Sequence, residues 1–309
     1  MSADVHDAAT LDTLATEASD GIGIMLGQLP TAALTTLMND GDATIAAAVR
    51  ETLPHITTAI DGAAARMRQG GRLLYVGAGT SGRLGILDAS EIPPTFGTSD
   101  DVVIGIIAGG PTAIVNAVEA AEDNADAGAA DIDLHVVGPL DTVVGIASSG
   151  RTPYVIGALR RAAMLGALTV GVSCNRNAPV TVAANIGIEV IVGPEVVTGS
   201  TRLRAGTATK MVINMISTIT MIRLGKTYGT LMVDVKATND KLRHRARRIV
   251  ATATGAPASI IEESLDAADW HAKTAIAMIA LHVGPEEART ALGTVDGFLD
   301  RLITKATTR

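Results

Sequence analysis

Two short stretches of the chain combine glycine with hydroxyl side chains at a spacing that suits phosphate binding. The first, residues 77–82, reads Gly-Ala-Gly-Thr-Ser-Gly, and the second, residues 147–152, reads Ala-Ser-Ser-Gly-Arg-Thr. Each follows an apolar run that predicts a strand and precedes a pattern that predicts a helix. Free N–H groups at a helix N-terminus, together with Ser and Thr hydroxyls, favour a bound phosphate. The candidate phosphate ligands are Thr80, Ser81, Gly82, Ser148, Ser149, Gly150 and Thr152.

The first stretch also fits the GxGxxG pattern of dinucleotide-binding folds, but its surroundings argue against a dinucleotide. That interpretation requires an acidic residue about 20 positions further on, at the end of the second strand. The second predicted strand instead ends in the residues IIAGG at 106–110. The alternative that both turns are ordinary helix caps stays open, because Ser and Thr are favoured at caps in any case. A third hydroxyl cluster at 198–201 favours a shared sugar-phosphate site.

The elements that must position these turns alternate between strand and helix. Apolar runs predict five strands, at 73–76, 102–107, 143–147, 168–173 and 186–192. This alternation predicts an α/β fold in which a mainly parallel sheet has helices on both faces. Because ligands bind at the carboxyl ends of the strands in such sheets, the two turns should meet at one crevice.

The chain divides into three predicted segments. Residues 1–68 form an N-terminal helical segment, residues 69–250 contain the strands, and residues 256–309 form a small C-terminal helical domain. Within the second segment, the stretch 193–210 predicts a loop or a helix start that lines the site. An apolar helix is expected over 210–224.

Composition excludes several classes of protein. The net charge of −7 and the 2% aromatic content argue against a nucleic-acid partner. The six histidines show no pair at ligand spacing on one helix, so no metal site is expected. No apolar stretch approaches the ~20 residues of a membrane helix, and the acidic start MSADVHDAAT does not resemble a signal peptide. With Cys174 as the single cysteine, we expect a protein of the reducing cytoplasm.

The motifs GAGTSGR, ASSGRTP and VVTGSTRLRAGTATK together resemble the sugar isomerase (SIS) domain, a three-layer sugar-phosphate-binding fold with a parallel five-stranded sheet. More narrowly, GRLLYVGAGTSGRLGILDASEIPPTFG, AVEAAED and LMVDVKATNDKL resemble the N-acetylmuramic acid 6-phosphate etherase family, which is related to glucokinase regulatory protein. The resemblance covers about residues 53–242. One departure is visible, because the family has Arg-Asn-Pro soon after an N-terminal Thr-Glu, whereas Ala-Ser-Asp-Gly follows Thr16-Glu17 here.

This resemblance implies a lyase of cell-wall amino sugar catabolism that needs neither metal nor cofactor. The family removes D-lactate from the C3 ether of N-acetylmuramate 6-phosphate by elimination and then hydration, leaving N-acetylglucosamine 6-phosphate. It implies Glu91 as the acid that protonates the departing oxygen and Glu122 as the base that removes the C2 proton. It also implies a homodimer. Weaker candidates for lining the sugar site are Glu195, Ser200, Thr201 and Lys210.

Local sequence offers a physical reason for each carboxyl group. The prolines at 93–94 predict that the helix opening near Gly82 ends just before Glu91, where the helix dipole favours a protonated carboxyl. Glu122 follows Val118 by four residues and Val115 by seven, which predicts a place beside the buried stripe of a helix over 111–125. The structural alternatives, a surface glutamate and a glutamate at the edge of the core, stay open.

Two other functions fit the same scaffold. An aldose–ketose sugar-phosphate isomerase would need one base that moves a proton between C1 and C2. A non-catalytic sugar-phosphate sensor would need only the binding site. Sensors that regulate transcription add a DNA-binding helix-turn-helix, for which the acidic N-terminal helices are poorly suited, and the glucokinase type has two SIS domains where this chain has room for one.

Overall fold

The computed structural model describes residues 14–18, 25–118, 120–235, 237 and 239–307. The chain divides into two compact units. The first comprises Met1–Ala89 and Val103–Ser217, and the second comprises Ser90–Val102 and Thr218–Arg309. The acidic start that argued against a signal peptide lies outside the described residues.

A parallel sheet of five strands forms the centre of the first unit and confirms the predicted α/β fold. The strands are β1 (Leu73–Gly77), β2 (Val103–Ile107), β3 (Thr142–Ile146), β4 (Leu168–Ser173) and β5 (Ile186–Glu189). Their order in the sheet is β2-β1-β3-β4-β5. The interior strand β1 pairs with the edge strand β2 on one side and with the central strand β3 on the other. The strand order therefore reverses between β1 and β3, which is where open α/β sheets bind their ligands.

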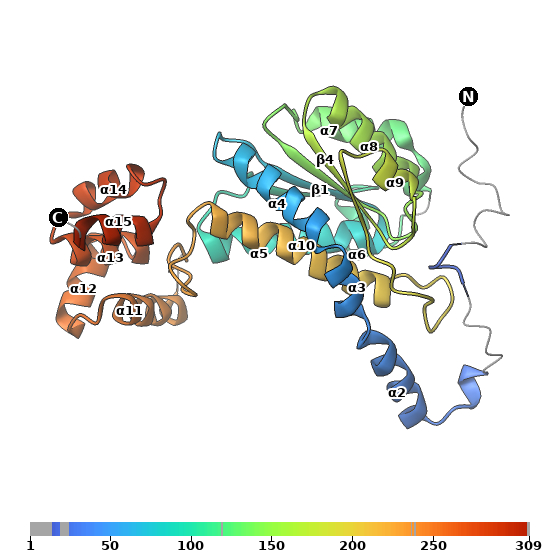
Figure 1. The fold of residues 1–309 in the computed structure, drawn as a ribbon, viewed down its shortest axis with the longest axis horizontal. Helices are drawn as coiled ribbons and strands as arrows, with labels where there is room; N and C mark the ends of the chain where they lie inside the picture. The colour runs from blue at the N-terminus through green and yellow to red at the C-terminus, as the bar shows by residue number, and fades with distance from the viewer. Residues whose placement is uncertain (1–13, 19–24, 119, 236, 238, 308–309) are drawn as a thin grey trace. The chain divides into compact units, whose positions relative to one another are not determined.

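Helices cover both faces of this sheet (Figure 1). One face carries α7 (Ala125–Leu134), α8 (Pro153–Met164) and α9 (Pro179–Val182), and the other carries α4 (Leu53–Met67), α5 (Gly79–Phe96) and α10 (Arg204–Arg223). Strand β1 shows why both faces need cover. Leu74 and Val76 share a core cluster with Tyr154 of α8, whereas the Tyr75 hydroxyl donates to the Ile213 carbonyl of α10 at 3.2 Å. Side chains alternate between faces along a strand, so every residue of β1 is buried.

Shorter helices precede the sheet, as the helical spacing of apolar residues predicts. They are η1 (Leu26–Gln28), α2 (Thr31–Asp42) and α3 (Ile45–Glu51), followed by α4. Ile45 and Val49 on α3, and Ile56 and Ile60 on α4, are buried at a spacing of four residues. The expectation of helix over residues 1–13 and 19–24 lies outside the described residues.

The second unit is helical and has its own core. It contains α11 (Asp240–Thr254), α12 (Ala258–Ala267), α13 (Ala272–Leu281), α14 (Pro285–Gly293) and α15 (Leu299–Thr307). Leu265, Ile276 and Leu299 are fully buried in one cluster. The buried Asp234 carboxylate accepts from Lys273 Nζ at 2.6 Å and lies 3.0 Å from His271 Nε2. Burial would raise the pKa of Asp234, but the His271 hydrogen bond and the Lys273 charge outweigh it and lower the pKa.

The predicted helix over residues 111–125 is wrong. The structure has one helical turn, α6 (Thr112–Val115), and a short 3₁₀ helix, η2 (Ala121–Asp123). Ala120 adopts φ +60°, a left-handed conformation that a right-handed helix cannot contain. Val115 is 80% exposed and Val118 is 41% exposed, so the apolar stripe invoked for Glu122 is not buried.

The predicted end of the helix before Glu91 is also wrong. Helix α5 continues through Pro93 and Pro94 to Phe96. Two prolines inside a helix remove two hydrogen bonds, yet Ile92 and Phe96 lie four residues apart and are both buried. Burial of these two large side chains offsets the lost hydrogen bonds. Glu91 therefore lies more than one turn before the helix end, beyond the reach of the terminal dipole.

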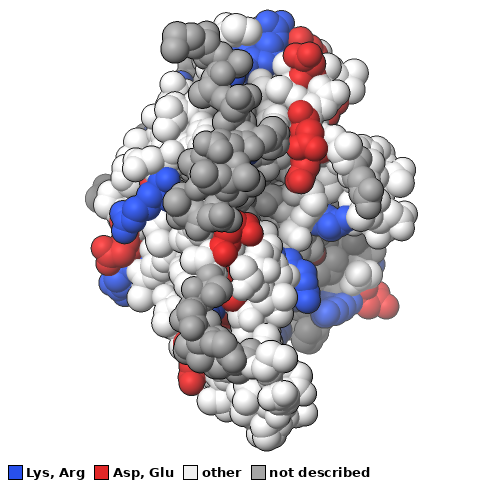
Figure 2. All heavy atoms as spheres, turned by 90° about the vertical axis from the view of Figure 1, so that its right-hand side faces the viewer, with Lys and Arg blue, Asp and Glu red and all other residues white. Residues whose placement is uncertain are grey.

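Charged side chains of both signs are interspersed on the face drawn in Figure 2. The described residues of that face form no continuous basic surface. Among the described residues, no helix combines the length and the apolar character needed to cross a membrane.

Candidate functional site

The turn from Gly77 to Gly82 lies at the carboxyl end of β1. Because β1 ends at Gly77 and α5 begins at Gly79, the hydroxyls of Thr80 and Ser81 lie in the first turn of the helix. A Cβ atom on Gly82 would lie 2.8 Å from the Gly77 carbonyl oxygen and 2.6 Å from Ile107 Cγ1. Only glycine allows this close approach of strand and helix. The first N–H groups of the helix are left without partners in the helix and can bind an anion.

The turn from Ser148 to Thr152 lies at the carboxyl end of β3. Thr152 occupies the N-cap position of α8, but its side chain makes no capping hydrogen bond. The cap alternative therefore does not account for this threonine. Gly150 has φ +73°, and a Cβ atom there would lie 2.3 Å from Ala178 Cβ. The turn thus depends on glycine, while Ser149 Oγ accepts from the Arg151 N–H at 3.3 Å.

These two turns leave the sheet side by side. Gly77, the last residue of β1, is in register with Ile146, the last residue of β3. The hydroxyls at 80–81 and 148–152 therefore flank the point where the strand order reverses. The prediction that the two turns meet at one crevice is confirmed, although no signal in the local sequence gives the strand order that brings them together.

Asn175 is a residue of this region that the sequence reasoning missed. It follows the end of β4, and its buried side chain donates to the carbonyl oxygens of Ser148 and Ser149, both at 3.2 Å. The same amide group binds Thr16, accepting from its N–H at 3.3 Å and donating to its Oγ1 at 3.0 Å. Asn175 thus ties the second turn to the N-terminal segment. A polar residue at the carboxyl end of a parallel strand was the available signal.

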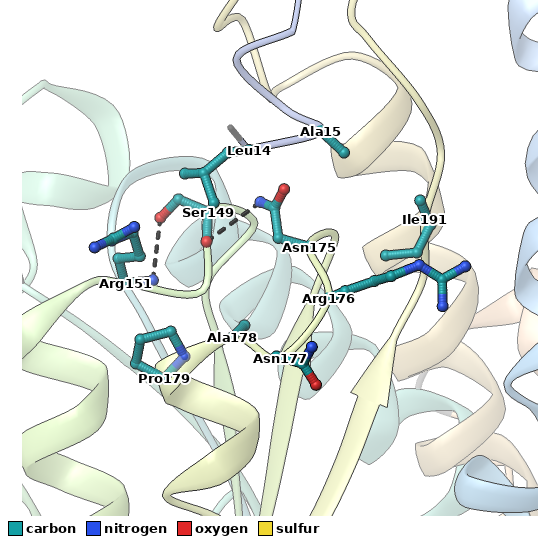
Figure 3. A pocket seen from close by; sticks show the side chains of 10 residues that line it. All are labelled: Leu14, Ala15, Ser149, Arg151, Asn175, Arg176, Asn177, Ala178, Pro179 and Ile191. Carbon is teal, nitrogen blue, oxygen red and sulfur yellow. Dashed lines mark hydrogen bonds between the residues drawn. The ribbon is translucent and has the colours of Figure 1, made fainter. Parts of the chain in front are cut away.

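A cavity of about 300 Å³ lies beside this second turn, and Figure 3 shows the side chains that line it. Its lining combines Leu14 and Ala15 from the N-terminal segment with Ser149, Arg151 and residues 175–179. Glu17, two residues further on, lies beside Gly199, since a Cβ atom on that glycine would be 3.0 Å from Glu17 Oε2. The departure from the family pattern concerns residues 18–21, of which 19–21 lie outside the described residues.

Glu122 lies beside the first turn despite the wrong helix prediction. It is an exposed residue of η2 and lines a cavity of about 190 Å³ with Ala78, Gly79 and Arg83. The structure thus brings Glu122 to the glycine turn at the end of β1. Glu91 is an exposed residue of α5 and belongs to the second unit, whereas Glu122 belongs to the first.

Glu195 has a different environment from the one expected of a sugar ligand. It is 4% exposed, and its two carboxylate oxygens accept from the N–H groups of Arg204 and Ala205 at 2.9 Å and 3.0 Å. These are the first N–H groups of α10, so the carboxylate caps that helix. Thr201 also lies near the start of α10, where its carbonyl oxygen would be 3.5 Å from a Cβ atom on Gly206.

Lys210 is an exposed residue of α10 whose ammonium group contacts the neighbouring Asn214. The side-chain oxygen of Asn214 accepts from Lys210 Nζ at 2.8 Å, and its amide nitrogen donates to Asp88 Oδ1 at 2.9 Å. Burial raises the pKa of Asp88 against the hydrogen bonds of Tyr75 and Ser217, which lower it. These contacts link Lys210 on α10 to Asp88 on α5.

No group of three or more His, Cys, Asp or Glu side chains suited to a metal ion occurs in the part of the chain that the structure describes. Cys174 is buried and unpaired. Burial, and then the negative charge of Glu195, raise the pKa of its thiol to about 12. The polar side chains at the two turns are therefore the hydroxyl groups of their Ser and Thr residues, the amide of Asn175 and the carboxyl group of Glu122.

Known proteins similar to this chain include an SIS domain and a family of etherases. Residues 55–163 match the model of the glucokinase regulatory protein N-terminal SIS domain. The N-acetylmuramic acid 6-phosphate etherase of Streptomyces coelicolor is 58% identical over 280 residues, which is 90% of each chain. The enzyme of the same name from Streptomyces avermitilis is 55% identical over 94% of each chain.

Solved structures show a more distant similarity. The sugar isomerase domain of the RpiR transcription factor from Sphaerobacter thermophilus is 15% identical, with a TM-score of 0.43. That match covers 62% of this chain and 93% of the other.

Proposed function

The chain belongs to the N-acetylmuramic acid 6-phosphate etherase family, and from this premise we propose that it cleaves the lactyl ether of N-acetylmuramate 6-phosphate. The products are N-acetylglucosamine 6-phosphate and D-lactate, so the enzyme is a carbon–oxygen lyase. The observation that carries the proposal is the pair of hydroxyl-rich turns at the reversal point of the sheet, with Glu122 lining a cavity beside the first turn.

The two turns are the proposed phosphate site. Hydroxyls and helix N-terminal N–H groups surround a phosphate with donors, and no metal is required for this. Asn175 supports the site by fixing the carbonyl groups of the second turn. The proposed phosphate ligands are Thr80, Ser81, Gly82, Ser148, Ser149, Gly150 and Thr152. Ser200, Thr201 and Lys210 are proposed to line the sugar, and Glu195 to support them through the start of α10.

The reaction needs two carboxyl groups in opposite protonation states. Opening the sugar to its aldehyde acidifies the C2 proton, and Glu122 removes that proton as the base. Glu91 protonates the lactyl oxygen as the C3–O bond breaks, and water then adds at C3. Placing Glu122 beside the phosphate turn gives the base a fixed distance from the anchored end of the substrate.

Release of D-lactate from N-acetylmuramate 6-phosphate tests the function directly. Turnover of an aldose phosphate without any lactate would replace the etherase by an isomerase. For the roles of the carboxyl groups, Glu122→Gln should bind substrate but lose exchange of the C2 proton with deuterium from solvent. Its kcat should fall about 100- to 10,000-fold, the usual contribution of one general base.

Glu91→Gln should keep C2 exchange and lose lactate release, because only protonation of the leaving group is impaired. Asp123→Asn is the matched control, since it removes one exposed carboxylate beside Glu122 in the same short helix. Wild-type exchange in Glu122→Gln would show that another group is the base.

We also propose a cytoplasmic homodimer, with residues 69–250 as the SIS domain between an N-terminal helical segment (1–68) and a small C-terminal helical domain (256–309). The free Cys174 supports the reducing compartment, because proteins there keep unpaired thiols. The dimer is supported by the apolar side chains of Ile219 and Ile222 on α10, which are 36% and 42% exposed. Light scattering should give twice the mass of one chain, and a single-chain mass would refute the dimer.

A further inference from the structure

The segment that carries Glu122 has little burial to hold it in place. Helix α6 is a single turn, and the described residues between it and η2 form neither helix nor strand. Val115 is 80% exposed, the large side chains of Ile114 and Val118 are 39% and 41% exposed, and the residues that face inward are the small Ala113 and the partly buried Ala121. Because stabilisation by burial scales with apolar area, two alanines and two half-covered large side chains give a weaker anchor than a buried helix face would. Another interaction must fix the position of Glu122.

Arg83 provides such an interaction from α5. Its Nε donates to the carbonyl oxygen of Ile114 at 2.9 Å, and its Nη2 donates to that of Asn116 at 2.9 Å. Asn116 is the residue at which α6 ends and the chain becomes extended, with φ −121° and ψ 157°. One planar guanidinium thus binds two carbonyl groups at the point where the chain leaves the helix. An ammonium group cannot reproduce this fork geometry.

The cavity beside the first turn connects Arg83 to Glu122. Both residues line it, and none of its other lining residues has an ionisable side chain. Arg83 directly follows Gly82 in the first turns of α5. The helix that presents the hydroxyls of Thr80 and Ser81 therefore also binds the segment that leads to the base.

We propose that Arg83 is a positioning residue, which holds the chain at 114–116 and so keeps Glu122 at the distance from the phosphate turn that proton removal requires. This inference rests on the proposed function. Arg83 acts through the main chain, so its loss should change the chemical step more than substrate binding. Displacing a reacting group by about 1 Å can lower a rate by about 100-fold.

The test compares Arg83→Met and Arg83→Lys with the wild-type protein. Arg83→Met should lower kcat for lactate release and the rate of C2 deuterium exchange by about 100-fold, with KM largely unchanged. Arg83→Lys keeps the charge and can reach one carbonyl group, so its rates should lie between the two. The matched control is Arg161→Met, which removes another half-exposed helix arginine, bonded through Nε to Asp133 at 2.7 Å.

Amide hydrogen exchange measured by mass spectrometry tests the contact without any substrate. Peptides covering residues 112–124 should exchange faster in Arg83→Met than in wild type or in Arg161→Met. Unchanged exchange in these peptides would overturn the proposal, and so would faster exchange with wild-type C2 deuteration. A rise in KM at unchanged kcat would also overturn it, because Arg83 would then serve phosphate binding. If wild-type protein releases no lactate, the proposed function fails, while amide exchange still decides whether Arg83 holds the segment.

Discussion

Replacing Glu195 with glutamine should destabilise the first unit by about 2 kcal/mol, with only a minor effect on substrate binding. The reason lies in the start of α10, where both carboxylate oxygens of Glu195 accept main-chain hydrogen bonds. One of those N–H groups belongs to Ala205, which is 0% exposed. Water cannot replace the lost partner there. Glu195 thus binds the N-terminus of a helix that begins nine positions later in the chain.

The magnitude follows from what glutamine can still do. Its amide keeps one acceptor oxygen, so one of the two N–H groups remains bonded and the other faces a donor. A buried N–H without a partner costs about 1–3 kcal/mol. Loss of the negative charge at the helix N-terminus adds about 0.3–1 kcal/mol, and the easier burial of a neutral amide offsets part of the sum.

Urea unfolding followed by circular dichroism measures the loss of stability, and kcat and KM are measured on the same preparations. Glu51→Gln is the matched control, because it removes the charge of an exposed glutamate on α3 whose carboxylate makes no hydrogen bond to the described residues. A large rise in KM for Glu195→Gln at unchanged stability would refute the capping argument. It would instead support Glu195 as a residue that lines the sugar, which the sequence predicts.

Two further predictions follow from buried titratable groups. Burial alone would raise the pKa of Asp141, but hydrogen bonds from Arg72 and from the Gly138 N–H, with the Arg72 charge, lower it below its usual value. The ionised form therefore stabilises the fold, so wild-type stability should fall as the pH drops from about 5 towards 2, and Asp141→Asn should show a smaller fall in urea titrations. Because the pKa of Cys174 is raised to about 12, its thiol should react with a disulfide reagent at pH 8 only after unfolding. Rapid modification of the native protein would contradict its burial.

The strands and the glycine turns are readable from the sequence because local properties specify them. Strands buried on both faces need continuous apolar runs, and the predicted run at 168–173 matches β4 residue for residue. The turn at 77–82 needs glycine where β1 and α5 approach, as the close contacts of Gly82 show. Both features, an apolar run and a glycine at a close approach, can be recognised in a few consecutive residues.

The surroundings of the two carboxyl groups were predicted less well. Val115 and Val118 have helical spacing with Glu122, yet the chain leaves the helix after one turn. Spacing shows which residues could share a face but not whether another element covers that face. Conversely, the prolines after Glu91 predicted a helix end, and burial of Ile92 and Phe96 outweighed their local preference.

The sequence by itself determined the five apolar strands, the two hydroxyl-rich turns and the resemblance that points to Glu91 and Glu122, because each depends on residue types close together in the chain. The tertiary structure alone decided that β1 and β3 are neighbours, so that the two turns flank one position. It also decided that Arg83 binds the carbonyl group 31 residues away and that Asn175 binds the turn 26 residues before it. Strand order and these long-range hydrogen bonds arise from packing between distant segments, which no local pattern records.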